Sequence, residues 1–179
     1  NQLSSFHCLY PEMDDLHTWE QAGCLMRKSI QFHWANQAYE SFEHFLSFMR
    51  SAKRKKIKQE RKKIIDHGIT FDVISGDQAS DSEWKFLYDC YHHTYAIRGT
   101  NPYLNFDFFL ELKKRVGKNT LLIIASKSGK RIAAALNLLS GNAILGRYWG
   151  ANEYVPGLHF ETCYYQTIDY AIQNRYKTF

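Results

Sequence analysis

The stretch from Thr120 to Tyr176 constrains the fold more than any other part of the chain, because three short apolar segments lead into an amphipathic one. The apolar segments are TLLIIAS (120–126), RIAAALNLL (131–139) and AILGRYWG (143–150). Ser128-Gly129 and Gly141-Asn142 separate them, and such pairs are typical of tight hairpin turns. The pattern therefore predicts an antiparallel meander of three strands.

The segment Leu158–Asn174 follows this meander after the loop EYVPG. Its apolar and small side chains recur at spacings of three and four, which predicts a helix with one buried face. The residues of this expected face are Phe160, Cys163, Tyr164, Thr167, Ile168 and Ala171. Tyr176–Phe179 come just after the helix and could begin another strand.

A strand and two helices are expected ahead of the meander. The strand is expected over Ile69–Ile74. Ser80 and Glu83 form a capping box at the start of the first helix, in which each side chain satisfies the other residue's backbone donor. Asn105 can cap a second helix that ends near Val116-Gly117. The order in this part of the chain is thus strand, helix, helix, three strands, helix.

The N-terminal part has a different organisation. We expect a strand over Ser5–Tyr10 and a short helix over Glu12–Ala22. One or two strands, with partial alternation, are expected over Cys24–Ala35. A sheet that ends at Tyr176–Phe179 has an open edge, and open edges recruit partners. We therefore expect Ser5–Tyr10 and Ile30–Ala35 to pair with this sheet, or the protein to form a homodimer.

The positive charge is concentrated in one segment. Residues 50–63 carry nine Lys and Arg against Glu60 alone, a net charge of +8 in a chain whose total is +5. A helical apolar period followed by Gly68 predicts one long helix over Tyr39–Asp66. Like charges that point outward are typical of a solvated linker helix. The other interpretation is an anion-binding arm for tRNA, nucleotide or phosphate-rich substrate, formed by Lys53, Arg54, Lys55 and Lys56.

Composition bounds the class of protein. With 179 residues, of which 45% are hydrophobic, the chain is long enough to bury a core. It has no run of about 18 apolar residues, so no membrane span is expected. Its four cysteines are far apart in apolar surroundings and are expected to be reduced, as in a cytoplasmic protein. No Asp, Glu or His cluster has metal-ligand spacing, so no metal is expected.

Five strings carry a resemblance to a known family: IQFHWANQAY, KRKKIKQERKK, NPYL, ALNLLSGNAILGRYWG and LHFETCYYQTIDYAI. Together with the order of elements, they resemble the Fem-like N-acyltransferases of the peptidoglycan biosynthesis or recognition type, over nearly the whole chain. The resemblance implies an α/β (α+β) fold of the GNAT acyltransferase kind, with a mixed, mostly antiparallel sheet flanked by helices. Fem-like proteins carry two GNAT-like halves in tandem. The resemblance therefore implies the tail of a first half in 1–38, a long basic linker helix in 39–67, and a second half, truncated at its C-terminus, in 68–179.

The resemblance also implies transfer of an acyl or aminoacyl group onto an amine, with a peptidoglycan precursor as one expected acceptor. GNAT enzymes hold the pyrophosphate of coenzyme A on a glycine-containing loop at a helix N-terminus. Pro156-Gly157-Leu158-His159 occupies that position here and departs from the glycine-rich pattern. Fem-like enzymes that use aminoacyl-tRNA also lack the pattern, so acyl-CoA and aminoacyl-tRNA both stay open as donors.

Three residues near the start of the expected helix 158–174 are candidates for chemistry. His159 and Glu161 lie in its first turn, where either side chain could take the proton from the amine. For Glu161 the alternative is favourable capping electrostatics at a helix start. Cys163 could act as a nucleophile near the helix N-terminus, but packing on the apolar face is the favoured interpretation.

Arg147, Tyr148 and Trp149, on the last strand of the meander, are expected to bind substrate. Strand alternation puts Arg147 and Trp149 on one face and Tyr148 on the other. An Arg in an apolar strand needs an anionic partner. That partner is either a phosphate or carboxylate of the substrate, or one of the carboxylates of Glu153 and Glu161.

The loop between the two expected helices contains Arg98 and Tyr103, and GNAT-like folds contact acceptors there. Two functions therefore stay open. The first is a cytoplasmic N-acyltransferase. The second is a noncatalytic module that keeps the fold and uses the basic helix to bind tRNA, other nucleic acid or an anionic cell-wall precursor.

Overall fold

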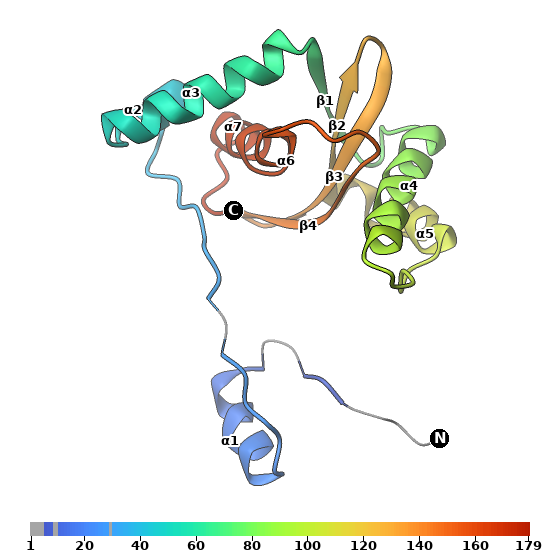
Figure 1. The fold of residues 1–179 in the computed structure, drawn as a ribbon. Coiled ribbons are helices and arrows are strands. Elements are labelled where there is room, and N and C mark those ends of the chain that lie inside the picture. The colour runs from blue at the N-terminus through green and yellow to red at the C-terminus, as the bar shows by residue number, and fades with distance from the viewer. Residues whose placement is uncertain (1–5, 9–10, 29) are drawn as a thin grey trace. The chain divides into compact units, whose positions relative to one another are not determined.

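The computed structural model describes residues 6–8, 11–28 and 30–179, and it divides into the units Asn1–Phe32 and His33–Phe179 (Figure 1). In the first unit, α1 (Met13–Gln21) confirms the predicted short helix. The predicted strand Ser5–Tyr10 lies partly outside the described residues, and its described part, 6–8, is not a strand.

The prediction of strands in Cys24–Ala35 is wrong for the residues that are described. They form no strand, and only Ala35 makes a single bridge, to Thr178. Leu25 is 100% exposed and Phe32 91% exposed. The alternation of this segment is only partial, and a strand is stabilised by side-chain packing on a neighbouring layer, which these two side chains do not have.

The second unit is built on one antiparallel sheet with the strand order β1-β2-β3-β4. Its strands are β1 (Ile69–Ser75), β2 (Thr120–Lys127), β3 (Lys130–Ser140) and β4 (Ala143–Ala151). This confirms the predicted meander and the strand that precedes it. Ser128 and Gly129 have φ values of 49° and 75°, the left-handed backbone that a tight two-residue hairpin requires.

Helices cover both faces of this sheet (Figure 1). α4 (Asp81–Ile97) and α5 (Phe106–Val116) lie on one face, where α4 packs on β3 and β4. Their shared core has these fully buried members: Trp84, Leu87, Tyr91, Phe109, Leu122 and Leu136. A Cβ at Gly150 would lie 2.0 Å from the Cys90 carbonyl oxygen, so only glycine permits this close approach of α4 to β4.

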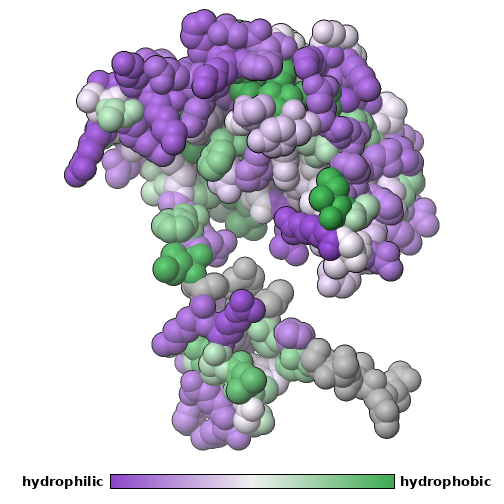
Figure 2. All heavy atoms as spheres, viewed as in Figure 1, coloured by the Kyte–Doolittle hydropathy of each residue, from purple (hydrophilic) through white to green (hydrophobic). Residues whose placement is uncertain are grey.

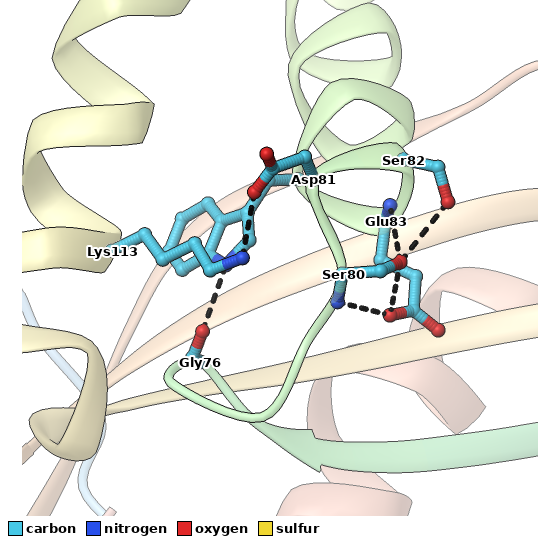
Figure 3. Close-up of polar contacts among 7 residues, drawn as sticks. Gly76, Ser80, Asp81, Ser82, Glu83 and Lys113 are labelled. Atoms are coloured by element: carbon cyan, nitrogen blue, oxygen red, sulfur yellow. Dashed lines mark hydrogen bonds and ion pairs between the residues drawn. The ribbon is translucent and has the colours of Figure 1, made fainter.

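Both predicted helix starts are confirmed. Ser80 and Glu83 form the complete capping box of α4, and the Asn105 side chain accepts the Phe108 N–H at the start of α5. Figure 3 shows this box beside the Lys113–Asp81 ion pair, which links α5 to α4. The Trp84 indole N–H donates to the Gly76 carbonyl oxygen at 2.9 Å, which ties α4 to the end of β1.

The predicted single helix Tyr39–Asp66 is wrong, because two helices occupy this range. α2 (Phe42–Ser47) ends in a turn, and α3 (Ser51–Asp66) starts after Arg50, whose backbone is extended with a ψ of 142°. The Arg54 guanidinium donates to the carbonyl oxygens of Ser47 and Met49. These bonds satisfy carbonyls at the end of α2 that a continuous helix would have satisfied itself.

The helix after the meander is also interrupted. It consists of α6 (Leu158–Phe160), a π-helical turn (Glu161–Tyr165) and α7 (Gln166–Gln173), and it packs on the face of the sheet opposite α4. The expected buried face is confirmed in α7 for Thr167, Ile168 and Ala171. It is not continuous with the residues before α7, because the π turn has more residues per turn than an α-helix. Phe160 and Tyr164 are exposed instead.

Within the second unit, residues 34–36 pair with residues 177–179, which lie far from them in the sequence. Trp34 and Phe179 exchange backbone hydrogen bonds of 2.6 and 2.9 Å, and the Asn36 N–H donates to the Lys177 carbonyl oxygen at 2.8 Å. Thr178 also bridges to Ala143 in parallel orientation. Part of the expected pairing of Ile30–Ala35 with the sheet is thus present, at Trp34 and Ala35, and it runs through Thr178. None of the helices in the described ranges has the length and apolar character needed to cross a membrane.

A buried ion pair fixes α3 against the π turn. Arg61 Nε lies 3.1 and 3.2 Å from the two carboxylate oxygens of Glu161, and Arg61 Nη2 lies 3.0 Å from Glu161 Oε1. The Gln166 amide donates to the same carboxylate at 2.8 Å. The Tyr165 hydroxyl donates to Glu60 at 3.0 Å, and burial is the main cause that raises the pKa of Tyr165.

We predict that Arg61→Met lowers the free energy of unfolding more than Glu161→Gln does. Arg61→Met leaves a carboxylate that is 4% exposed without its cation, and breaking a buried pair from one side costs about 3–5 kcal/mol. Glu161→Gln leaves Arg61, whose side chain is 24% exposed and can turn toward water.

Urea denaturation at pH 7 measures both variants. Lys62→Met is the control, because its pair with Asp66 is exposed on both sides and exposed pairs contribute about 0–1 kcal/mol. Equal losses for Arg61→Met and Lys62→Met would contradict the prediction.

Candidate functional site

A β-bulge interrupts β4 at Arg147. Tyr148 pairs with Leu136 and Gly146 with Asn137, so Arg147 is an extra residue without a partner on β3. The Arg147 guanidinium lies 5.3 Å from the centre of the Tyr148 ring. Tyr148 and Trp149 face opposite sides of the sheet, as predicted, but the bulge takes Arg147 out of the regular alternation on which its predicted face depended.

The environment of Arg147 bears on the choice between an internal ion pair and a bound anion. Of the two carboxylates considered, Glu153 pairs with Lys127 and Glu161 with Arg61. Within the described ranges, Arg147 has no ion pair with a carboxylate. Arg147 is exposed. The side chain is therefore available to an anionic group of a substrate.

Trp149 and His159 lie together on the face that carries α6 and α7. Their ring centres are 5.1 Å apart in an edge arrangement, and the Tyr164 ring lies 5.7 Å from His159. Burial against these rings lowers the pKa of His159 below its ordinary value of 6.5. The residue is still exposed to solvent in part. A neutral imidazole next to solvent can accept a proton.

Glu161 has a different environment from the one expected at the start of a helix. It is 3% exposed, and both of its oxygens accept hydrogen bonds from Arg61. The Glu161 carboxylate thus points toward α3 from the π turn, rather than lying free in a first helical turn. Cys163 in the same turn is half-buried, and burial raises the pKa of its thiol, which favours packing over nucleophilic chemistry.

Tyr148 faces α4 and α5 and begins a chain of aromatic contacts that leads to the α4–α5 loop. Ring centres are 4.9 Å apart for Tyr148 and Tyr91, 4.9 Å for Tyr91 and Tyr95, and 5.9 Å for Tyr95 and Tyr103. Arg98, at the end of α4, is exposed at the start of this loop. The sheet thus separates Tyr148 and the loop from Trp149 and His159.

A shallow cavity of about 410 Å³ adjoins this loop. It is lined by Tyr88, His92, Pro102, Tyr103, Leu104, Asn105 and Phe108. Of the predicted substrate-binding residues, Tyr103 belongs to this cavity.

The predicted anion-binding residues lie in the first half of α3, where Lys53, Lys55 and Lys56 are exposed. Arg54 is half-buried and holds the α2–α3 junction, so its role differs from that of its neighbours. Figure 2 shows hydrophilic side chains along the upper surface, over α2 and α3. Lys53, Lys55 and Lys56 are therefore the solvent-facing cations of this group, and these three lysines are called the α3 row below.

Sequence reasoning missed two buried polar residues close to the bulge and the π turn. Asn137 Nδ2 and Thr162 Oγ1 are buried and have no hydrogen-bond partner. The signal for Asn137 was available, since it is the one polar residue in the segment IAAALNLL. No group of three or more His, Cys, Asp or Glu suited to a metal ion occurs in the parts of the chain that the structure describes.

The fold is similar to that of two solved structures. One is the C-terminal domain of a putative lysylphosphatidylglycerol synthetase from Agrobacterium fabrum, with a TM-score of 0.58 and 14% identity over 93% of this chain and 50% of that one. The other is L-PGS from Bacillus licheniformis, with a TM-score of 0.53 and 13% identity over 94% of this chain and 49% of that one. The chain thus spans about half the length of the structures it matches. No curated protein matches it.

At this level of identity the likeness concerns the fold, and it confirms the α/β class that the family resemblance implied. A family model supplies the closer assignment. The model described as peptidoglycan biosynthesis/recognition, of the FemAB-like type, matches residues 1–179. The chain therefore belongs to the FemAB-like family.

Proposed function

We propose that the protein transfers an acyl or aminoacyl group from an ester or thioester donor directly onto an amine. The observation that carries this proposal is the pair of Trp149 and His159, whose rings are 5.1 Å apart where β4 meets α6. The FemAB-like family and a fold like that of a putative lysylphosphatidylglycerol synthetase domain support a transfer of this class, in peptidoglycan or lipid synthesis.

His159 is the proposed general base. Its lowered pKa keeps the imidazole neutral at physiological pH, so it can accept the amine proton as the nitrogen attacks the donor carbonyl carbon. The C–N bond forms, the ester or thioester bond breaks, and the leaving oxygen or sulfur takes up a proton. Glu161 takes no part in this proposal, because Arg61 and Gln166 occupy its carboxylate.

Arg147 is the proposed anion-binding residue of the site. It is exposed at the β4 bulge and lies outside the ion pairs made by Glu153 and Glu161. A donor of either class carries phosphate, and guanidinium groups bind phosphate through directed hydrogen bonds. Arg98 and Tyr103 lie at the α4–α5 loop, on the other side of the sheet from His159, so this proposal gives them no contact with the reacting amine.

The donor class is tested by ligand-dependent thermal stabilisation with acetyl-CoA, aminoacyl-tRNA and a nucleotide-linked muramyl peptide. A ligand at about 100 times its dissociation constant adds roughly 2.7 kcal/mol to the stability of the folded state. Stabilisation by aminoacyl-tRNA, but not by the deacylated tRNA, would identify an aminoacyl ester donor. If none of the three ligands raises the melting temperature, the proposal is wrong.

A second candidate function rests on the exposed cations of α3. Lys53 and Lys55 are exposed and lie in a segment with a net charge of +8. Such a row gains affinity for nucleic acid through counterion release. A noncatalytic module that binds tRNA or an anionic precursor would use this row alone, whereas a transferase that takes aminoacyl-tRNA would use it together with His159.

We predict that His159→Ala lowers kcat about a hundredfold, as expected for loss of a general base. A base must be neutral, and burial lowers the pKa of His159, so protonation of His159 should make wild-type kcat/KM decline with a midpoint on the acid side of the ordinary histidine pKa. His159→Ala should abolish this decline. Initial rates with the donor that stabilises the protein measure both effects.

His67→Ala is the control, since His67 is exposed at the end of α3. It should leave the rate and the pH profile unchanged. Full activity of His159→Ala, or an unchanged acid limb, would remove His159 as the base.

We predict that the triple variant Lys53→Gln, Lys55→Gln, Lys56→Gln weakens tRNA binding and reduces its salt dependence. Each lost phosphate contact should reduce the slope of log K against log salt by about 0.7–0.9. Arg54 stays in place, because it holds the α2–α3 junction. Fluorescence anisotropy over a range of salt concentrations measures the slope.

A second triple variant, Lys114→Gln, Lys118→Gln, Lys130→Gln, has the same change in net charge at exposed positions elsewhere. Identical slopes for the two variants would show that total charge, rather than the α3 row, governs binding.

A further inference from the structure

Asn137 is a buried polar residue in the middle of an apolar strand. It is 1% exposed, and its amide nitrogen Nδ2 has no hydrogen-bond partner. A buried donor without a partner destabilises the folded protein. Leucine has a similar size and would avoid this penalty. The folded protein thus tolerates a group that its own stability does not require.

The position of Asn137 connects it with the proposed site. Leu136 belongs to the core beneath α4, so Asn137 faces the opposite side of the sheet, which α6, the π turn and α7 cover. Its partner on β4 is Gly146, next to the Arg147 bulge. A Cβ at Gly146 would lie 3.7 Å from Asn137 Oδ1 and 3.3 Å from the Phe179 ring. The absence of a side chain at Gly146 leaves this space to the half-buried Phe179 ring.

Thr162 is a second polar residue of the same kind on the same side of the sheet. It is 0% exposed in the π turn, which packs on β2 and β3, and its hydroxyl has no partner. Thr167, one turn further and equally buried, differs in that its hydroxyl donates to the Cys163 carbonyl oxygen at 3.0 Å. Single π turns inside helices occur frequently at functional sites.

We propose that Asn137 binds the carbonyl oxygen of the transferred acyl or aminoacyl group through Nδ2–H, with Thr162 as a second polar contact to that group. This inference rests on the proposed transferase function. The group would enter at Gly146 and displace the Phe179 ring. A carbonyl oxygen accepts hydrogen bonds, which matches the free donor of Asn137.

The chemistry gives such a contact a direct effect on the rate. As the amine nitrogen adds to the carbonyl carbon, the C=O electron pair moves onto oxygen, and the negative charge strengthens its hydrogen bond to Nδ2–H. The pair returns as the bond to the leaving oxygen or sulfur breaks. A donor placed in a site without bulk water lowers the energy of this charged state, and loss of one such donor reduces kcat about 10²–10³-fold in other enzymes.

The first arm of the test measures thermal unfolding without ligand for Asn137→Leu, Thr162→Val and the matched control Thr167→Val. Asn137→Leu and Thr162→Val should keep or raise the melting temperature, because each removes an unpaired buried group. Thr167→Val should lower it, because it breaks a formed hydrogen bond. A melting temperature lowered by Asn137→Leu as much as by Thr167→Val would assign Asn137 a structural role and overturn the proposal.

The second arm measures initial rates for the same variants, with aminoacyl-tRNA and acetyl-CoA as donors. Asn137→Leu should reduce kcat at least tenfold and change KM less than threefold, whereas Thr167→Val should keep at least half of the wild-type kcat. Wild-type turnover with an unchanged kcat in Asn137→Leu would refute the role of Asn137 and leave the transferase function intact. Absence of turnover in the wild-type protein with both donors would refute both.

The third arm observes the Asn137 side chain itself. The ¹⁵N–¹H signals of its NH₂ group, identified by their loss in Asn137→Leu, should shift when acetyl-CoA or aminoacyl-tRNA binds to the wild-type protein. Signals that stay in place while the ligand stabilises the protein would show that the site lies elsewhere. If an ordered water is the partner of Nδ2, the signals should also stay in place when the ligand binds, and the proposal would again be wrong.

Discussion

The burial of both faces of the two central strands is the constraint on which the rest of the structure depends. Residues 121–125 of β2 and 132–136 of β3 are all at most 3% exposed. A sheet with two apolar faces needs a covering layer on each. α4 and α5 supply one layer, and α6, the π turn and α7 supply the other, supported from outside by α3. The proposed site lies where the second layer meets β4.

Two local irregularities of backbone geometry shape this site. The β4 bulge gives Arg147 a position outside the regular pairing, and the π turn moves Glu161 toward α3 while Phe160 and Tyr164 face solvent. The bulge and the π turn each insert one residue into a regular element. Such an insertion destabilises the element unless other contacts offset it. The ion pair of Arg61 with Glu161 compensates for the second. The proposed functional residues occur beside these two insertions.

The sequence predicted the regular parts of the fold well, because each carried a local signal. Hairpin residues, the Ser80–Glu83 box and the Asn105 cap act over a few residues, and the structure has all of them. The misses have a common physical cause. The bulge lies between paired strands and the π turn is fixed by a distant contact, that of Arg61 with Glu161, while the break at Phe48–Arg50 depends on the Arg54 side chain bonding to Ser47 and Met49; the helical apolar period shows none of these. Asn137 was visible in the sequence, but only its burial without a partner gives it meaning.

The ion pair of α3 with the π turn separates two kinds of electrostatics on one helix. Arg61 and Glu161 are largely shielded from solvent, whereas Lys53 and Lys55 face it. Mobile ions screen exposed charges over about 10 Å at 0.1 M salt and act much less on buried pairs. If the α3 row binds a polyanion as proposed, a rise in ionic strength would therefore release it while α3 keeps its place on the sheet. The proposed binding and release of an anionic partner would then require no local unfolding of α3.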